Sequence, residues 1–167
     1  LYQLAERIDK ENAVLLGQDS YVYQALNAKK KQVKGKIDMT VALTLDKKSE
    51  DRERFVSFVN STPTFDGGFH NDRVKRLFIN AIKEKSERLA KKAKVTLNDN
   101  DILQGVTFVI GIIMPNPRFE SQTKRKLVRD LQLEKGLEQF MNKAMTKFLR
   151  TQKDYIDLVI ERAKTRH

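Results

Sequence analysis

A largely apolar run, Val106 to Met114, constrains the fold of this chain more than any other segment. Pro115 and Pro117 follow it. Proline stops a strand because it lacks the amide hydrogen that a sheet ladder needs and because its ring fixes φ. The run therefore predicts a buried strand that ends near Met114 and continues into a loop.

The loop after this strand is polar. Gln122, Thr123 and Lys124 offer an amide, a hydroxyl and an ammonium within three consecutive positions. These groups donate hydrogen bonds of the kind that phosphate oxygens accept, and a rigid strand would present them. The same three residue types also occur in ordinary solvated loops, so the residues alone leave both interpretations open.

The length and composition limit the possible architectures and sites. With 167 residues the chain is long enough for one domain with a substantial core, and we expect residues 1–167 to form a single domain. No apolar run approaches the roughly 18 residues that suggest a membrane span. Because the chain has no cysteine and only two histidines, we expect neither a disulfide nor a metal site.

The charge balance points to a class of partner. Lysine and arginine number 33 against 22 aspartates and glutamates, which gives a net charge of +11. A surplus of this size favours a polyanionic partner such as nucleic acid, because binding releases condensed counterions. A basic charge also promotes solubility, so it is not diagnostic by itself.

The first half of the chain predicts two strands. Residues 37–45 alternate between apolar and polar side chains, as in a half-buried strand. A charged turn at 47–51 and a second strand at 52–60 suggest an antiparallel hairpin. We expect residues 1–36 to form a short amphipathic helix and a basic connector. The lysine-rich part of that connector, residues 29–36, is either a solvated turn or a contact with a DNA backbone.

Three further segments predict helices. A long helix is expected from about Asn71 to Ala93, with Asn71 as its N-cap, and two more near residues 133–148 and 155–163. The order strand, strand, helix, strand, helix, helix predicts an α+β fold, in which a mixed or antiparallel sheet carries helices on one face. The outer side of the long helix carries basic residues that either contact DNA or form a solvated face: Lys83, Arg88, Lys91 and Lys92.

A glycine pair lies between the second strand and the long helix. Gly67 and Gly68 allow positive φ and close backbone approach, so we expect them to shape a turn together with His70. His70 has no adjacent nucleophile to activate, and its expected role is structural.

Two sequence blocks resemble one family. NPRFESQTKRKL, residues 116–127, is similar to the QTK loop of type IIA DNA topoisomerases, which include bacterial gyrase B, topoisomerase IV and eukaryotic topoisomerase II. FVNSTPTFDGGFH, residues 58–70, resembles the family block F-V-N-x-x-x-T-x-x-G-G-x-H. The order and separation of the blocks also fit, and the resemblance covers roughly residues 37–167.

The resemblance implies a fold and roles for the loop residues. It implies the transducer domain of the ATPase region, with a fold similar to domain 2 of ribosomal protein S5. Lys124 would reach the γ-phosphate of ATP, and Gln122 would hydrogen-bond that phosphate or the attacking water. Thr123 would mainly order the loop. ATP and Mg²⁺ would be bound mainly by an upstream domain, so this segment alone is not expected to hydrolyse ATP.

The resemblance also implies a biological role. The segment would couple ATP binding and hydrolysis to gate closure and DNA strand passage in an isomerase. Its partners would be double-stranded DNA, the upstream ATP-binding domain, a second protomer joined through the ATPase region, and a DNA-cleaving subunit or domain. The location would be cytoplasmic or nucleoid-associated, or nuclear in a eukaryote.

Two alternatives share some of these features. The segment would suit the second domain of another two-domain ATPase, such as a MutL-like mismatch-repair protein, although that family lacks the Q-T-K wording. It would also suit a free-standing basic nucleic-acid-binding module with an S5-like fold. DNA relaxation by the full protein would distinguish a topoisomerase from the first alternative. Salt-dependent duplex binding without any effect on an ATPase would favour the second.

Overall fold

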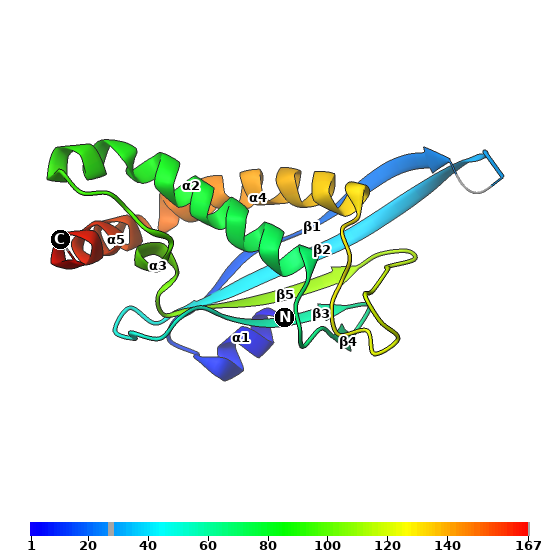
Figure 1. Cartoon of the computed structure of the whole chain (residues 1–167), viewed down its shortest axis with the longest axis horizontal. Helices are drawn as coiled ribbons and strands as arrows, with labels where there is room; N and C mark the ends of the chain where they lie inside the picture. The colour runs from blue at the N-terminus through cyan, green and yellow to red at the C-terminus, as the bar shows by residue number, and fades with distance from the viewer. Residues whose placement is uncertain (27–28, 167) are drawn as a thin grey trace.

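A computed structural model describes residues 1–26 and 29–166 (Figure 1). Residues 27–28 of the expected connector, and residue 167, lie outside the described residues. The elements in chain order are α1 (Tyr2–Ile8), β1 (Ala13–Leu26), β2 (Gln32–Leu45), β3 (Arg54–Val59), β4 (Thr62–Pro63), α2 (Phe69–Ala93), α3 (Asp99–Leu103), β5 (Val106–Ile113), α4 (Leu131–Thr151) and α5 (Lys153–Arg166).

The five strands form one mixed sheet in the order β1-β2-β5-β3-β4. The predicted buried strand is confirmed as β5, which lies at the centre, antiparallel to β2 and parallel to β3. The α+β class expected from the sequence is confirmed as well. Because β5 is the middle strand and has a hydrogen-bonded neighbour on each side, the segment that follows it leaves from the centre of the sheet.

The predicted hairpin between residues 37–45 and 52–60 is wrong. Both segments are strands, but β5 lies between them, and Thr107 of β5 is paired with both Thr44 and Arg54. The connecting loop is held open by the start of β5: the Asp46 amide donates to the Gly105 carbonyl, and the Gly105 amide donates to the Asp51 carbonyl. Alternation of side chains defines which face of a strand is buried, but it does not say which strand lies next to it.

The expected connector before residue 37 is largely a strand. β1 pairs antiparallel with β2 from Ala13 opposite Thr44 to Leu26 opposite Gln32, with an irregularity between Leu15 and Gly17. Most of β1 is exposed or half-buried on both faces, so its sequence lacks the clear alternation of a strand with one buried face. The short amphipathic helix expected before it is confirmed as α1.

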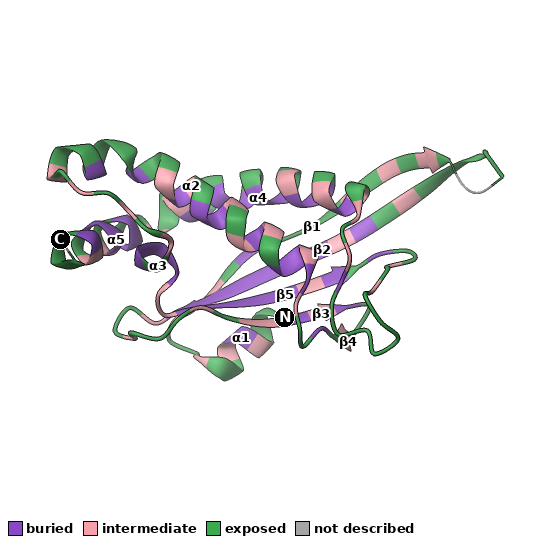
Figure 2. Cartoon of the chain, viewed as in Figure 1, coloured by how far each residue is buried: buried purple, intermediate pink, exposed green. Residues whose placement is uncertain are grey.

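The helices divide between the two faces of the sheet. α2 and α4 cover one face, and α5 packs against α2 and α3 at the end of this layer (Figures 1 and 2). Aromatic rings fill the space between them: the Phe78 ring lies edge-on to Phe108 of β5 at 5.4 Å and to Phe148 of α4 at 5.7 Å. The small helix α1 lies on the opposite face, where Ala5 packs against Ala42 and Val109.

The α2 helix begins earlier than predicted. Its first residue is Phe69 and its N-cap position is Gly68, whereas Asn71 is buried inside the first turn and does not cap the helix. The Phe69 amide donates to the carbonyl of Leu127 at 3.0 Å. A tertiary backbone contact therefore satisfies the helix start, in place of the side-chain cap that sequence reasoning expects.

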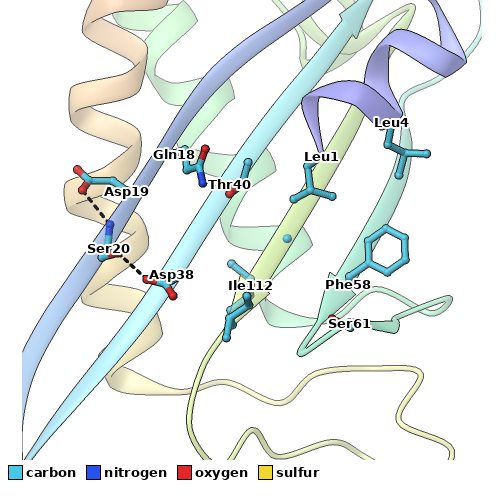
Figure 3. A pocket seen from close by; sticks show the side chains of 12 residues that line it. Leu1, Leu4, Gln18, Asp19, Ser20, Asp38, Thr40, Phe58, Ser61 and Ile112 are labelled. Atoms are coloured by element: carbon cyan, nitrogen blue, oxygen red, sulfur yellow. Dashed lines mark hydrogen bonds between the residues drawn. The ribbon is translucent and has the colours of Figure 1, made fainter.

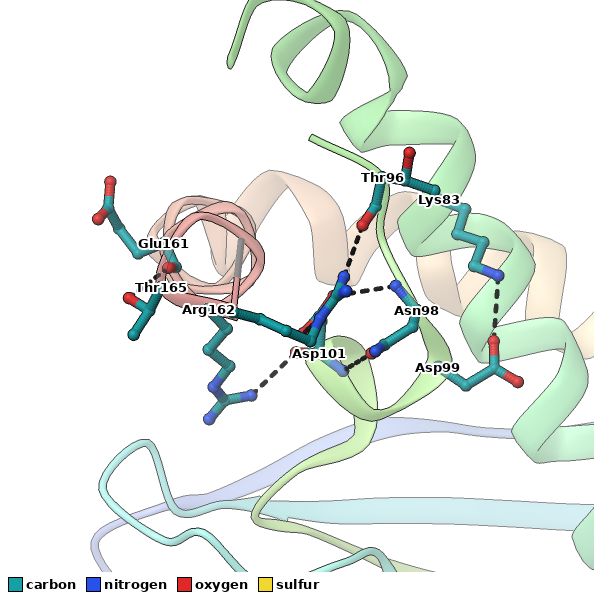
Figure 4. A network of polar contacts seen from close by, with 9 residues as sticks. Lys83, Thr96, Asn98, Asp99, Asp101, Glu161, Arg162 and Thr165 are labelled. Carbon is teal, nitrogen blue, oxygen red and sulfur yellow. Dashed lines mark hydrogen bonds and ion pairs between the residues drawn. The ribbon is translucent and has the colours of Figure 1, made fainter. Parts of the chain in front are cut away.

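A polar cluster ties α5 to the segment before β5 (Figure 4). The Asp101 carboxylate is buried and accepts from the Asn98 amide at 2.9 Å, while the Asn98 side chain accepts from the Asp101 amide at 2.8 Å. Arg166 of α5 pairs with the same carboxylate at 2.9 Å. This capping box at the start of α3 thus also anchors the end of the last helix.

A second buried polar chain joins β3, Thr64 just after β4, and α2. The Ser57 and Thr64 hydroxyl oxygens lie 2.6 Å apart, and the Thr64 hydroxyl lies 3.1 Å from His70 Nε2. His70 is fully buried, and burial lowers its pKa from 6.5 to about 4. The imidazole is therefore neutral at physiological pH and serves as a hydrogen-bonding group in the core.

This burial makes stability depend on pH. The unfolded chain binds a proton at His70 below about pH 6.5 while the folded chain resists it, so stability is full above that pH and falls towards pH 4. We expect the wild type to lose about 2 kcal/mol more unfolding free energy than His70→Gln between pH 7 and pH 5. Urea denaturation at both pH values measures this. Equal losses would contradict it, because both proteins share every carboxylate.

Candidate functional site

The polar loop predicted after β5 forms a small hairpin. The Val128 amide donates to the Arg118 carbonyl at 2.8 Å, and Phe119 lies opposite Leu127 in a β-bridge. A turn closes the tip, where the Lys124 amide donates to the Ser121 carbonyl at 3.2 Å. The segment 118–128, called the tip hairpin below, thus has defined backbone hydrogen bonds although it belongs to no sheet strand.

Asn60 fixes the point at which the chain leaves β5. Its side-chain nitrogen donates to the Met114 carbonyl at 2.9 Å, and its side-chain oxygen accepts from the Met114 amide at 2.8 Å. The Asn60 amide also donates to the Ile112 carbonyl at 2.8 Å. Because β3 and β5 run parallel, the end of one strand holds the end of the other. Asn60 belongs to the block at residues 58–70, but sequence reasoning assigned it no role.

The glycine pair supports the base of the tip hairpin. The Leu127 amide donates to the Gly67 carbonyl at 3.2 Å, while the Leu127 carbonyl accepts from the Phe69 amide at 3.0 Å. At Gly68, φ is +119°, and a Cβ there would lie 2.4 Å from the Leu127 nitrogen. Main chain therefore packs directly on main chain, and only glycine fits. The two sequence blocks, far apart in the chain, meet at this contact.

The two cations that follow Lys124 are paired with acids. Arg125 Nε lies 3.0 Å from an Asp66 carboxylate oxygen, and its guanidinium lies over the exposed Phe65 ring at 5.4 Å from the centroid. Lys126 Nζ lies 3.6 Å from Glu120. These side chains lie along the sides of the tip hairpin, and their charges are partly neutralised.

The turn at the tip of the hairpin differs from its sides in the partners of its side chains. The Ser121 and Thr123 hydroxyl oxygens lie 2.6 Å apart and order the turn. Within residues 1–26 and 29–166, no hydrogen bond or ion pair reaches the side chains of Gln122 or Lys124, and both residues are exposed. Lys124 also has φ +57°, in the left-handed region. The arrangement presents one unpaired ammonium and one amide at the end of a braced hairpin, so a phosphate on a neighbouring body has open access to them.

The basic residues of α2 are arranged less favourably than their sequence suggests. Lys83 pairs with Asp99 at 3.0 Å, which lowers the pKa of that carboxyl, and Lys91 pairs with Glu87 at 3.1 Å. Arg88 is exposed, as is Lys92, the fourth predicted DNA contact. The four residues therefore form a partly neutralised surface.

A hollow of about 800 Å³ lies on the sheet face that carries α1 (Figure 3). Phe58 and Ile112 contribute apolar walls, and Asp19 and Asp38 lie at its polar end. Those carboxylates would repel the phosphates of a nucleotide, so the hollow is unsuited to ATP.

In the described part of the chain, no group of three His, Cys, Asp or Glu side chains is placed to hold a metal ion. None of the described helices is long and apolar enough to cross a membrane.

Comparison with known proteins identifies relatives over most of the chain. The family model for DNA gyrase B matches residues 3–167. The chloroplastic and mitochondrial gyrase B of Nicotiana benthamiana is 30% identical over 130 residues, which cover 76% of this chain and 17% of that protein. The type 2 topoisomerase B protein of Aquifex aeolicus is 30% identical over 114 residues, covering 67% of this chain and 14% of that protein.

Solved structures show the same fold. The 43K ATPase domain of Thermus thermophilus gyrase B, solved with an aminocoumarin, superposes with a TM-score of 0.66 at 19% identity, over 99% of this chain and 43% of that one. The ATPase region of Saccharomyces cerevisiae topoisomerase II gives 0.52 at 22% identity, over 90% and 33%. The chain spans less than a fifth of the Nicotiana and Aquifex proteins, at 17% and 14% of their lengths. Since the family model matches nearly every residue, the chain belongs to the DNA gyrase B family of type IIA topoisomerases.

Proposed function

We propose that this chain is the transducer domain of the ATPase region of a type IIA DNA topoisomerase. In this proposal the tip hairpin senses the γ-phosphate of ATP held by a preceding domain. The observation that supports it most is the unpaired ammonium of Lys124 at the exposed tip, while Arg125 and Lys126 beside it are paired with acids. An ammonium without a partner on its own chain is available to pair with a phosphate on another body.

Each tip residue has a distinct task in the reaction. Lys124 neutralises charge on the γ-phosphate as it leaves, and charge stabilisation of this kind is a principal source of catalysis in phosphoryl transfer. Gln122 donates a hydrogen bond to that phosphate or orients the attacking water. Thr123 orders the turn through its contact with Ser121. The upstream domain supplies the adenine pocket and the Mg²⁺ ligands.

The base of the tip hairpin converts this contact into movement of the domain. Asn60 and Gly68 tie the hairpin to β3 and to the start of α2, and β5 joins it to the sheet centre. A force on Lys124 therefore acts on the whole sheet. Contact exists only while the γ-phosphate is present, so the domain orientation reports the nucleotide state.

In the full protein this movement would close and reopen a gate for strand passage. The partners would be double-stranded DNA, the preceding ATP-binding domain, a second protomer joined through the ATPase regions, and a DNA-cleaving subunit or domain. The protein would act in the cytoplasm or on the nucleoid, or in the nucleus of a eukaryote. The chain alone is not expected to hydrolyse ATP, because the tip hairpin offers no adenine pocket.

Lys124→Ala in the full protein should lower ATP hydrolysis by roughly a hundredfold to a thousandfold, or about 3 to 4 kcal/mol, because a transition-state charge contact is lost. ATP affinity should change much less. Lys124→Arg should not rescue fully, since the planar guanidinium cannot occupy the ammonium's position. Lys126→Ala is the matched control and should be nearly silent, because its exposed pair with Glu120 contributes little. Equal, small losses at both lysines would refute the assignment.

Gly68→Ala should lower ATP hydrolysis by the full protein, although residue 68 lies at the base of the tip hairpin and not in its turn. A Cβ at position 68 would collide with the Leu127 backbone, so the tip hairpin must shift and the protein should lose roughly 3 kcal/mol of stability. Gly67→Asn is the milder comparison, because asparagine adopts a φ near +71° more readily than most residues and its Cβ would approach side-chain atoms of Asn71, from 2.9 Å, and no backbone atom. Thermal unfolding and ATP hydrolysis measure both variants. Equal tolerance at the two glycines would show that the backbone contact is unimportant.

A variant whose α2 helix lacks four positive charges tests the predicted DNA-binding surface. Changing Lys83, Arg88, Lys91 and Lys92 to glutamine should weaken a low-affinity, sequence-independent and salt-sensitive interaction with duplex DNA. Because Lys83 and Lys91 are already paired, the loss should be modest. Strand passage assayed at moderate salt is the measurement. Wild-type strand passage by the quadruple variant would exclude this surface.

A further inference from the structure

The first two strands extend well beyond the rest of the sheet. β5 pairs with β2 only from Asp38 to Leu45, whereas β1 and β2 remain paired as far as Leu26 opposite Gln32. Figure 1 shows this two-stranded segment projecting from the body on the side away from α5. Its described residues, 20–26 and 29–37, are called the ribbon arm below.

Three contacts stiffen the ribbon arm, although an isolated two-stranded ribbon is marginally stable. Tyr21 packs against α4 so closely that a Cβ at Gly136 would lie 3.0 Å from its side chain. Tyr23 stacks on Tyr21, with ring centroids 5.9 Å apart. Tyr23 also covers Gly35 on the opposite strand, where a Cβ would lie 2.1 Å from the ring. An aromatic ring over a cross-strand glycine holds the two strands in register.

The ribbon arm carries positive charge only. No aspartate or glutamate occurs between positions 20 and 37, and the lysines there are Lys29, Lys30, Lys31, Lys34 and Lys36. Lys34 lies opposite Gln24, and Lys36 lies opposite Val22, so both point to the face away from the two tyrosines. Lys36 pairs with Asp38 at the root of the arm, at 3.6 Å.

A stiff two-stranded ribbon that carries only positive charge suits duplex DNA as a partner. A two-stranded ribbon has the width that the major groove of duplex DNA admits, and its lysines match the phosphates on either side. The α2 surface is less suited, because Glu84 and Glu87 interrupt it. The exposed apolar side chains among the described arm residues are aliphatic, namely Val22, Leu26 and Val33. The tyrosines that would anchor the arm at a membrane interface instead pack on α4, on each other and on Gly35. An anionic membrane surface is therefore the less suited partner.

We infer that the ribbon arm is a DNA-binding element of this chain, separate from the tip hairpin and from the α2 surface. It contacts the duplex through phosphates and without sequence preference. The inference rests on the proposed function only for the choice of DNA as the polyanion. It requires neither ATP nor Lys124, so the two proposals can fail independently.

The test compares two triple variants of the 167-residue chain with the wild type. The arm variant changes Lys30, Lys34 and Lys36 to glutamine. The control variant changes Lys10, Lys48 and Lys147, which are exposed lysines elsewhere, to glutamine and so removes the same charge. Fluorescence anisotropy with a labelled duplex of arbitrary sequence, between about 50 and 200 mM salt, gives the affinity and its salt dependence.

The arm variant should bind roughly tenfold more weakly, and the slope of log affinity against log salt should fall by about 2, one each for Lys30 and Lys34, because Lys36 is already paired with Asp38. The control variant should stay within about twofold of the wild type. Equal losses in both variants would overturn the inference, because net charge alone would then explain binding. So would arm-dependent binding to phosphatidylserine vesicles in the absence of arm-dependent DNA binding.

The outcomes also separate this inference from the proposed function. If the α2 variant loses DNA binding and the arm variant retains it, the arm inference fails while DNA remains the partner. If the wild type does not bind DNA at all, the arm inference fails, while the tip-hairpin proposal, which ATP hydrolysis by the full protein tests, is unaffected. In the full protein the arm variant should keep the basal ATP hydrolysis rate in either case, because the arm lies apart from the tip hairpin.

Discussion

The pairing of β5 on both of its edges is the constraint on which the rest of the structure depends. This strand carries Phe108, whose ring contacts Phe55 of β3 at 5.0 Å and Phe78 of α2 at 5.4 Å, so the sheet and the helical layer meet on it. The tip hairpin continues from its end, and the α3 capping box precedes its start. A strand held in this way cannot move alone. A displacement of β5 would therefore involve the sheet and the long helix together.

The sequence predicted the class of fold better than its connections. Buried strands and amphipathic helices leave periodic patterns, and β5, α2, α4 and α5 followed from them with small errors at their ends. Strand neighbours leave no such pattern, so β3 was assigned to the wrong partner. No sequence pattern indicates β1, because neither of its faces is consistently buried. The start of α2 was misplaced since a tertiary contact with Leu127, which lies far along the chain, replaces a side-chain cap.

The candidate site was located by its sequence motifs and completed by geometry. The two blocks around Gly68 and Lys124 could be recognised in the sequence, but their mutual contact could not, because main-chain packing depends on the fold. The sequence also does not show which charged residues form ion pairs. Lys124, Arg125 and Lys126 look alike in the sequence, and only the structure shows acids beside the last two. Asn60 carries a strand-end clamp that no local pattern indicates, apart from its place in the recognised block.

The insertion of β5 between β2 and β3 also has a consequence for how the chain folds. These two flanking strands are synthesised first and are close in sequence, whereas their shared neighbour arrives only after α2 and α3. Until then each presents an unpaired edge, and pairing them directly with each other would be a local, rapidly formed alternative. A hairpin of this kind would have to open before β5 could enter. Folding should therefore be limited by this late step, and a chain truncated before Val106 should aggregate through the two exposed edges.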